Sequence, residues 1–369
     1  MWPSYSSECR KDVDGLLRRG GSLSAYKANP QVGVEPSRDS WAWRLEREVE
    51  TRFGVKHAVA CNSGTGALHS AIAASLAECG ASSGDVVVSP YTFSASAAAI
   101  LHAGYTPVFA DVDPYTFNIT PETVKKVLTR KTVGIVPVSL FGGMADVRGL
   151  KRFGLPVIED AAQAVGARNA DGYSGSQAIA AMYSMNGGKN VPAGECGVAV
   201  TNSHKISNRM RLLGNHGENF HQKQVGYNFR PNEVTACIAW HGLQELEERN
   251  QRRRELARAL PDRVEKDGGY LDVCGPRLDH VFYVFPLVLE KFPRPLFIRR
   301  MAKRGIPVGE GYITPPLHKY PAFRQYQTVP MPVVEELSSK TLCILSTLTP
   351  DRPLSYARKV AEAMRESLR

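Results

Sequence analysis

The sequence lacks the cysteine and histidine patterns of disulfide scaffolds and metal sites. Its seven cysteines are scattered over 369 residues, and no two of them form a Cys-x-x-Cys pair. His216 and His221 are the only closely spaced histidines, and no His-Glu-x-x-His motif accompanies them. We therefore expect no disulfide framework and no bound metal, and we expect a reducing compartment, the cytoplasm.

Long apolar runs, internal repeats and low-complexity tracts are also absent. No stretch approaches the roughly 20 apolar residues that a membrane-spanning helix needs. Residues 1–5, Met-Trp-Pro-Ser-Tyr, are not a basic region followed by an apolar run, which a secretory leader requires. We therefore expect a soluble protein that does not bind a membrane.

Positively charged residues outnumber negatively charged ones, and the formal net charge is +10. Such a charge attracts anions, whether nucleotide-linked metabolites, nucleic acid or acidic surfaces. No base-reading motif with interleaved aromatic residues occurs, so no nucleic-acid partner is expected. Charge is densest in Glu247–Arg258, where arginines alternate with glutamates. This alternation is typical of the solvated face of a helix.

Apolar strand-like runs alternate with helical patterns along most of the chain. This alternation predicts an α/β fold in which a mostly parallel sheet is covered on both faces, as three layers. The length allows more than one domain. We expect an N-terminal arm over 1–38, a large domain over 39–250 and a smaller C-terminal α+β domain over 251–369. A long helix is expected from Glu233 to about Leu260, bridging the two domains.

Residues 183–190, Tyr-Ser-Met-Asn-Gly-Gly-Lys-Asn, place one lysine among small and polar residues after an apolar run. A lysine amine attacks a carbonyl only when it is unprotonated, and partial desolvation favours that state. By itself the octapeptide also fits a solvated loop lysine. It does not fit a phosphate-binding loop, because Tyr183 stands where that motif needs its first glycine and Asn190 where it needs Ser or Thr.

A carboxylate follows an apolar run upstream, in the stretch from Leu155 to Ala164. Asp160 falls where such a strand would end, at the edge of an α/β sheet where ligands bind. A reactive lysine and a strand-end aspartate together suggest pyridoxal 5′-phosphate. Lys189 would hold this cofactor as a Schiff base, and Asp160 would pair with its pyridine nitrogen and keep it protonated.

Two further places fit the same cofactor. A strand at His57–Cys61, a small-residue turn and a helix from Ala67 form an anion site, because free N–H groups and the positive end of the helix dipole converge there. The cofactor phosphate is expected on Gly64 and Thr65. Phe93 follows a predicted strand and can stack on the cofactor ring, although an aromatic residue at such a place is usually part of the core.

The order of these motifs resembles one family. Ser-Gly-Thr, Pro-Tyr-Thr-Phe, Glu-Asp-Ala-Ala-Gln, Gly-Glu-x-Gly and Tyr-Asn-Phe-Arg look like the DegT/DnrJ/EryC1/StrS sugar aminotransferases, from about Ser22 to the last helix. The resemblance implies fold type I of the pyridoxal-phosphate enzymes and catalysis by Lys189 and Asp160. It implies that Gln163 lies near the ring hydroxyl, that Gly64, Thr65 and Ser184 hold the phosphate, and that Phe93 stacks on the ring. It also implies a homodimer in which Asn228 reaches the phosphate of the neighbouring subunit.

The sequence departs from the family pattern near these motifs. Cys196 replaces a glycine of the usual Gly-Glu-Gly-Gly turn, and Ser139 stands where many members carry histidine. Gly187 and Gly188 are smaller than the residues that commonly precede the lysine. These departures leave the substrate open. The lysine itself is present, whereas the dehydratase branch of the family carries histidine there, so the resemblance favours transamination.

The predicted function is transfer of an amino group from an amino acid, glutamate, to a keto group of a nucleotide-linked deoxysugar. Arg230, His318 and Lys319 are candidates to bind that substrate, and exposed surface charge is the other interpretation of all three. A cyclitol or another keto substrate, or sugar dehydration, stays open as an alternative. A non-catalytic regulator or nucleic-acid-binding protein is the alternative of another class.

Overall fold

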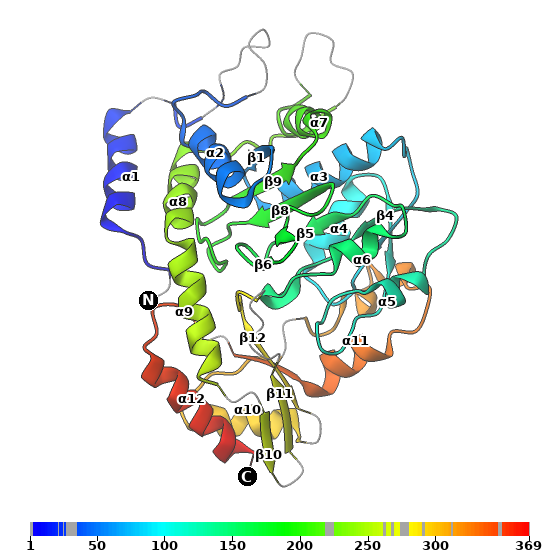
Figure 1. The fold of residues 1–369 in the computed structure, drawn as a ribbon, viewed down its shortest axis with the longest axis vertical. Helices are drawn as coiled ribbons and strands as arrows, with labels where there is room; N and C mark the ends of the chain where they lie inside the picture. The colour runs from blue at the N-terminus through cyan, green and yellow to red at the C-terminus, as the bar shows by residue number, and fades with distance from the viewer. Residues whose placement is uncertain are drawn as a thin grey trace.

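The computed structural model describes residues 3–20, 22–24, 26, 35–217, 225–260, 263–266, 269–273, 280–289, 292–310, 313–345 and 349–368 (Figure 1). Its helices are α1 (Ser7–Arg19), α2 (Trp41–Phe53), α3 (Gly64–Glu78), α4 (Ser94–His102), α5 (Pro121–Lys125), α6 (Val147–Lys151), α7 (His204–Gly214), α8 (Glu233–Gln244), α9 (Leu246–Arg258), α10 (Arg294–Lys303), α11 (Pro332–Glu336) and α12 (Leu354–Ser367). Short turns of other helix types are η1 (Leu140–Gly142), η2 (Leu317–Lys319), η3 (Arg324–Tyr326) and η4 (Leu337–Thr341).

The central sheet has the order β1-β9-β8-β5-β4-β2-β3. Its strands are β1 (His57–Cys61), β2 (Asp85–Val88), β3 (Thr106–Phe109), β4 (Thr132–Val136), β5 (Ile158–Asp160), β8 (Ala180–Ser184) and β9 (Gly197–Thr201). Parallel bridges between Ile135 and Val157 and between Val138 and Asp160 join β4 to β5. Strand β9 runs opposite to the other six strands of this sheet, so it is antiparallel to both of its neighbours, β1 and β8. The predicted mostly parallel sheet is confirmed.

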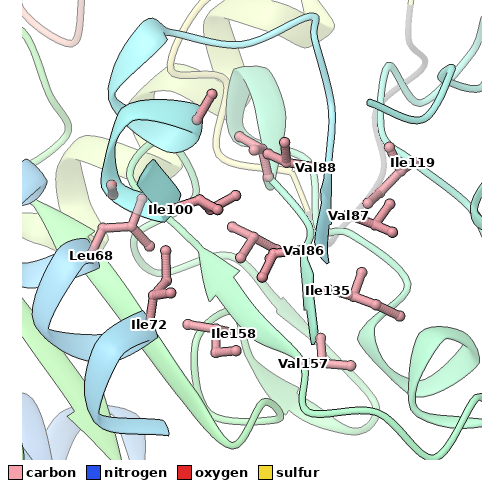
Figure 2. Packing of buried hydrophobic residues seen from close by; sticks show 14 of the residues in the cluster. Leu68, Ile72, Val86, Val87, Val88, Ile100, Ile119, Ile135, Val157 and Ile158 are labelled. Atoms are coloured by element: carbon pink, nitrogen blue, oxygen red, sulfur yellow. The ribbon is translucent and has the colours of Figure 1, made fainter. Parts of the chain in front are cut away.

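Alternating side chains along the strands bind a helical layer to each face of this sheet. Residues such as Val59 and Met182 pack with α3, α4 and α7, whereas their neighbours Ala60 and Tyr183 pack with α2 and α8. Figure 2 shows the first of these layers, with Leu68 and Ile72 of α3 on the same side as Val86 of β2, whereas Val87 points to the other side, toward Ile119. The predicted three layers thus follow from the period of two in side-chain direction along a strand.

A second, antiparallel sheet lies beyond the central one, with the order β10-β11-β12-β13. Its strands are β10 (Arg263–Lys266), β11 (Gly269–Val273), β12 (Phe285–Leu289) and β13 (Leu342–Leu345), and a hairpin elsewhere is formed by β6 (Arg168–Asn169) and β7 (Gly172–Tyr173). Phe285 and Leu287 of β12 pack with α10 and α12 in a core of their own. Figure 1 shows α9 running from the central sheet toward this second one. The predicted boundary at residue 250 falls within α9 and stays a prediction.

Two expectations about α8 and α9 are wrong. The long helix predicted from Glu233 to Leu260 is two helices, because Glu245, with φ −92° and ψ −3°, interrupts the helical repeat. The charged stretch is also not a wholly solvated face, since Arg249 and Arg253 are 7% and 2% exposed. Arg253 donates hydrogen bonds to two backbone carbonyls instead, so its charge stabilises a loop and does not face solvent.

Candidate active site

A cavity of about 350 Å³ opens where β5 and β8 end and where α3 and α4 begin. This is the carboxyl edge of the parallel strands, the place where α/β sheets bind ligands. Sequence reasoning singled out seven residues that line it, namely Gly64, Thr65, Phe93, Asp160, Gln163, Ser184 and Lys189. The fold therefore brings together motifs that lie more than 100 positions apart in the chain.

Lys189 stands at the end of a tight turn that follows β8. Its backbone N–H donates to the carbonyl of Asn186 at 2.8 Å, and the Asn186 side chain donates to Glu195 at 2.7 Å. Burial lowers the pKa of the Lys189 amine to about 8, and the nearby Asp160 carboxylate opposes that shift. Because its pKa is lowered from 10.5, far more of this amine is neutral near physiological pH than of a lysine in water.

Asp160 ends β5 and is 4% exposed. One carboxylate oxygen accepts a hydrogen bond from the Ser96 hydroxyl at 2.7 Å, and the other accepts one from the Ala162 N–H at 3.1 Å. Burial raises the pKa of Asp160, while these two donors and the Lys189 ammonium lower it. A carboxylate held in this way can pair with a cationic group that enters the cavity.

The opposite end of the cavity is the N-terminus of α3. The Ser63 hydroxyl caps this helix by accepting from the Gly66 N–H at 3.0 Å. A Cβ at Gly64 would lie 2.9 Å from both Cβ and Oγ of Ser184, so only glycine lets the helix start approach β8 so closely. Free N–H groups, the hydroxyls of Thr65 and Ser184 and the helix dipole converge here. These residues fit a phosphate group.

Gln163 and Phe93 lie on the walls between these two ends. The Phe141 N–H donates to Oε1 of Gln163 at 2.7 Å, which leaves the amide nitrogen of Gln163 as its donor toward the cavity. Phe93 is 59% exposed and lines the cavity, whereas Tyr91 is fully buried in the core. Phe93, and not Tyr91, is therefore placed where it can stack on a ligand in the cavity.

Four predicted site residues do not line this cavity. Asn228 is exposed and its carbonyl accepts from the Asn62 side chain at 3.0 Å. Arg230 donates to the Asn215 side chain and lines a different, smaller cavity. His318 is 1% exposed, so the interpretation of His318 as surface charge is wrong, and both His318 and Lys319 contact the Glu335 carboxylate. Within this chain the fold does not bring the four together with Lys189.

Sequence reasoning missed two side chains that line the cavity and contact its reactive groups, those of Ser96 and Tyr283. Ser96 donates to Asp160, and its place three positions after Phe93 on α4 could have suggested a shared face. Tyr283 lies beneath the Lys189 amine, 94 positions later in the chain, and no local pattern points to it. By contrast, the unusual residues Cys196 and Ser139 are fully buried and do not line the cavity.

Among the residues that the structure describes, no cluster of three His, Cys, Asp or Glu side chains could hold a metal ion. No helix within the same residues combines the length and the apolar character needed to cross a membrane.

A lysine and a buried aspartate in one cavity, with a helix N-terminus opposite, form the constellation of a pyridoxal-phosphate enzyme. The model of the DegT/DnrJ/EryC1/StrS aminotransferase family matches residues 40–365. The chain belongs to this family. As a DegT/DnrJ/EryC1/StrS aminotransferase it has the fold type I architecture, and the resemblance in its motifs is confirmed.

Similar proteins of this aminotransferase family carry different names. The chain is 32% identical to the pleiotropic regulatory protein of Geobacillus stearothermophilus over 87% of its own length and 89% of the relative's. It is 32% identical to UDP-N-acetyl-3-dehydro-alpha-D-glucosamine 3-aminotransferase of Acidithiobacillus ferrooxidans, with 88% of each chain covered. The solved structure of DesV from S. venezuelae matches with a TM-score of 0.85 and 28% identity, over 98% of this chain and 95% of that one.

Proposed function

We propose that the protein is a pyridoxal-phosphate aminotransferase that moves an amino group from glutamate to a keto group of a nucleotide-linked deoxysugar. The observation that carries this proposal is the pair of Lys189 and Asp160 facing one cavity of about 350 Å³, with the N-terminus of α3 at its other end. An amine, a carboxylate and a helix N-terminus in one cavity are the groups that suit a cofactor with a reactive carbonyl, a basic ring nitrogen and a phosphate.

Different residues of the cavity are proposed to hold different parts of this cofactor. Gly64, Thr65 and Ser184 bind the phosphate through N–H groups and hydroxyls. Asp160 pairs with the ring nitrogen, and its buried carboxylate keeps that nitrogen protonated. The Gln163 amide nitrogen donates to the ring hydroxyl, since Phe141 already occupies the amide oxygen. Phe93 covers one face of the ring.

The bound cofactor supplies an electron sink for negative charge at the carbon that carries the nitrogen. The lowered pKa of Lys189 keeps part of its amine neutral, which is the form that would hold the cofactor carbonyl. The same Nζ would hold and move the proton that passes to and from the substrate carbon.

The choice of a nucleotide sugar rests on the family and on charge. The Acidithiobacillus ferrooxidans relative is named for a UDP-linked keto sugar, and the chain is about equally long. A net charge of +10 favours an anionic substrate. Arg230, His318 and Lys319 are proposed to contact that substrate, although they do not line the cavity of a single chain. A cyclitol or another keto compound is the alternative substrate, and dehydration is the alternative reaction.

A homodimer is part of the proposal. Asn228 is exposed on this chain, and we place it at the phosphate of the partner's cofactor, so that two chains complete each site. Molar mass by light scattering tests this point, because a monomer at micromolar concentration that still binds the cofactor would contradict it.

The deciding experiment screens nucleotide keto-sugars with glutamate and detects 2-oxoglutarate and the amino sugar. Formation of both products in equal amounts is expected, and loss of the keto sugar without 2-oxoglutarate would indicate dehydration. The name of the Geobacillus relative makes a regulatory role the competing class. A purified protein that takes up no pyridoxal 5′-phosphate, or takes it up equally well after Lys189→Ala, would overturn the proposal in favour of that class.

A further inference from the structure

The segment of residues 280–284, here called the strap, directly precedes β12. The Val281 N–H donates to the carbonyl of Gly142 at 2.9 Å, and the Val284 N–H donates to the carbonyl of Phe141 at 3.4 Å. Gly142 has φ +110°, and a Cβ there would lie 2.7 Å from the Phe282 nitrogen. The strap is therefore pressed against the loop that also orients Gln163.

Two buried side chains fix the strap from its other side. Arg253 of α9 donates to the carbonyls of Phe282 and Tyr283, each at 3.2 Å. Asn190, next to Lys189, donates to the carbonyl of Val281 at 3.5 Å and to the Asn250 side chain of α9 at 2.7 Å. The strap and the turn that carries Lys189 are thus tied to the same helix.

These hydrogen bonds hold the strap so that the ring of Tyr283 lies beneath the Lys189 amine. Nζ of Lys189 lies 4.4 Å from the centre of the Tyr283 ring, and Tyr283 lines the same cavity as Asp160. An ammonium over an aromatic face is attracted by the ring quadrupole, and the attraction grows when water is removed. A ring face also offers no lone pair that would take the proton from the amine.

We propose that Tyr283 is a positioning residue for Lys189, whose ring face holds the amine at the cavity and stabilises it while it carries a proton. The proposal rests on the proposed function only in taking Lys189 as the reactive amine. The lysine must be neutral to bind a carbonyl and protonated for part of each proton transfer. The Asp160 carboxylate is shared with Ser96 and Ala162, so the ring face of Tyr283 supplies a second support for the amine.

The test measures how readily the Lys189 amine of the full, cofactor-free chain gives up its proton. Trace acetic anhydride labels neutral amines between pH 6 and 10, and mass spectrometry of the peptide containing Lys189 gives the pKa. For Tyr283→Leu, which removes the ring, we expect this pKa to fall by about one unit, since the contact stabilises the protonated form. Labelling at pH 7 then becomes several-fold faster. For Tyr283→Phe, which keeps the ring face and removes the hydroxyl, we expect the wild-type pKa.

Tyr356→Leu is the matched control, because it also removes a tyrosine ring that a cation contacts. Arg352 lies 4.7 Å from the centre of the Tyr356 ring, and Tyr356 belongs to α12, which does not line the cavity. This variant should leave the pKa of Lys189 unchanged. Near-UV circular dichroism checks folding, and Tyr283→Met replaces the leucine variant if the latter does not fold. An unchanged pKa in the ring-free variant overturns the inference, as does an equal shift in Tyr283→Phe. The assay uses no cofactor and no sugar, so failure of the proposed amino transfer would leave its result intact.

Discussion

Strand β5 ends in two consecutive residues that carry carboxylates, and the surroundings of the two carboxylates differ. Glu159 and Asp160 are consecutive and almost fully buried, at 1% and 4% exposure, and burial raises the pKa of both. Because side chains alternate along a strand, they point to opposite faces of the sheet. Burial and sequence position are thus nearly the same for both groups, and only their partners differ.

Glu159 is held by three donors and lies away from the cavity. The hydroxyls of Ser139 and Ser174 donate to one oxygen at 2.6 Å each, and the Gly175 N–H donates to the other at 2.8 Å. Asp160 has two such donors and the Lys189 amine nearby. The comparison teaches that a buried carboxylate is available for chemistry when it keeps acceptor capacity toward a cavity.

The largest effect is expected at Lys189, and its replacement tests whether the groups that face the cavity carry out the reaction. Lys189→Ala removes the amine that binds the cofactor and moves the proton, so kcat/KM for amino transfer should fall by about 10⁴-fold or more. Steady-state assays and the absorbance of bound cofactor measure this loss. Lys205→Ala is the control, because Lys205 is exposed on α7, and it should keep full activity. Residual transfer above one part in a hundred would contradict the assignment.

The next prediction compares the two carboxylates directly. Asp160→Asn should lower kcat/KM by about 10²-fold to 10³-fold, because a neutral amide no longer keeps the ring nitrogen protonated. Glu159→Gln should leave kcat/KM nearly unchanged. It should lower the free energy of unfolding by about 1–3 kcal/mol, since the new NH₂ group faces a donor of the buried set.

Denaturant unfolding and steady-state kinetics on both variants measure this split. If Glu159→Gln loses as much activity as Asp160→Asn, the two faces do not have separate roles.

Measurements of cofactor uptake at different pH values test the lowered pKa of Lys189. With a pKa of about 8, the neutral fraction of Lys189 rises about tenfold per pH unit below pH 8 and levels off above it. The initial rate at which the cofactor-free protein takes up pyridoxal 5′-phosphate should rise in the same way from pH 6 to 8. Stopped-flow absorbance follows it. A rise that continues to pH 10 would show a lysine with an ordinary pKa.

The smallest effect concerns the far end of the cavity. Gly64→Ala places a methyl group 2.9 Å from Ser184, and we expect about tenfold weaker cofactor binding and a loss of about 1–3 kcal/mol in stability. Gly15→Ala in α1 is the matched control. A Cβ at Gly15 meets no atom within 4 Å, so stability should rise by about 0.4–1 kcal/mol without any change in binding. If the two variants have equal stability and equal cofactor affinity, the close approach between Gly64 and Ser184 is not needed for cofactor binding.

Local patterns predicted the elements better than their pairing. The strand at His57–Cys61 was predicted with its observed bounds, and the helix after it begins at Gly64, three residues before the expected Ala67. The reversed direction of β9 could not be predicted, because an apolar run such as Gly197–Thr201 looks the same in either direction. The break at Glu245 was missed because its residues favour a helix on both sides.

The sequence by itself determined which residues carry reactive groups next to small neighbours, above all Lys189, Asp160 and Gly64. These signals are local, since a strand end or a helix start needs only a few residues to be recognised. Only the tertiary structure decided that Ser96 and Tyr283 join Asp160 and Lys189 at the cavity. The physical reason is that strand pairing and the path of the strap determine which distant side chains meet, and no short stretch of sequence records that.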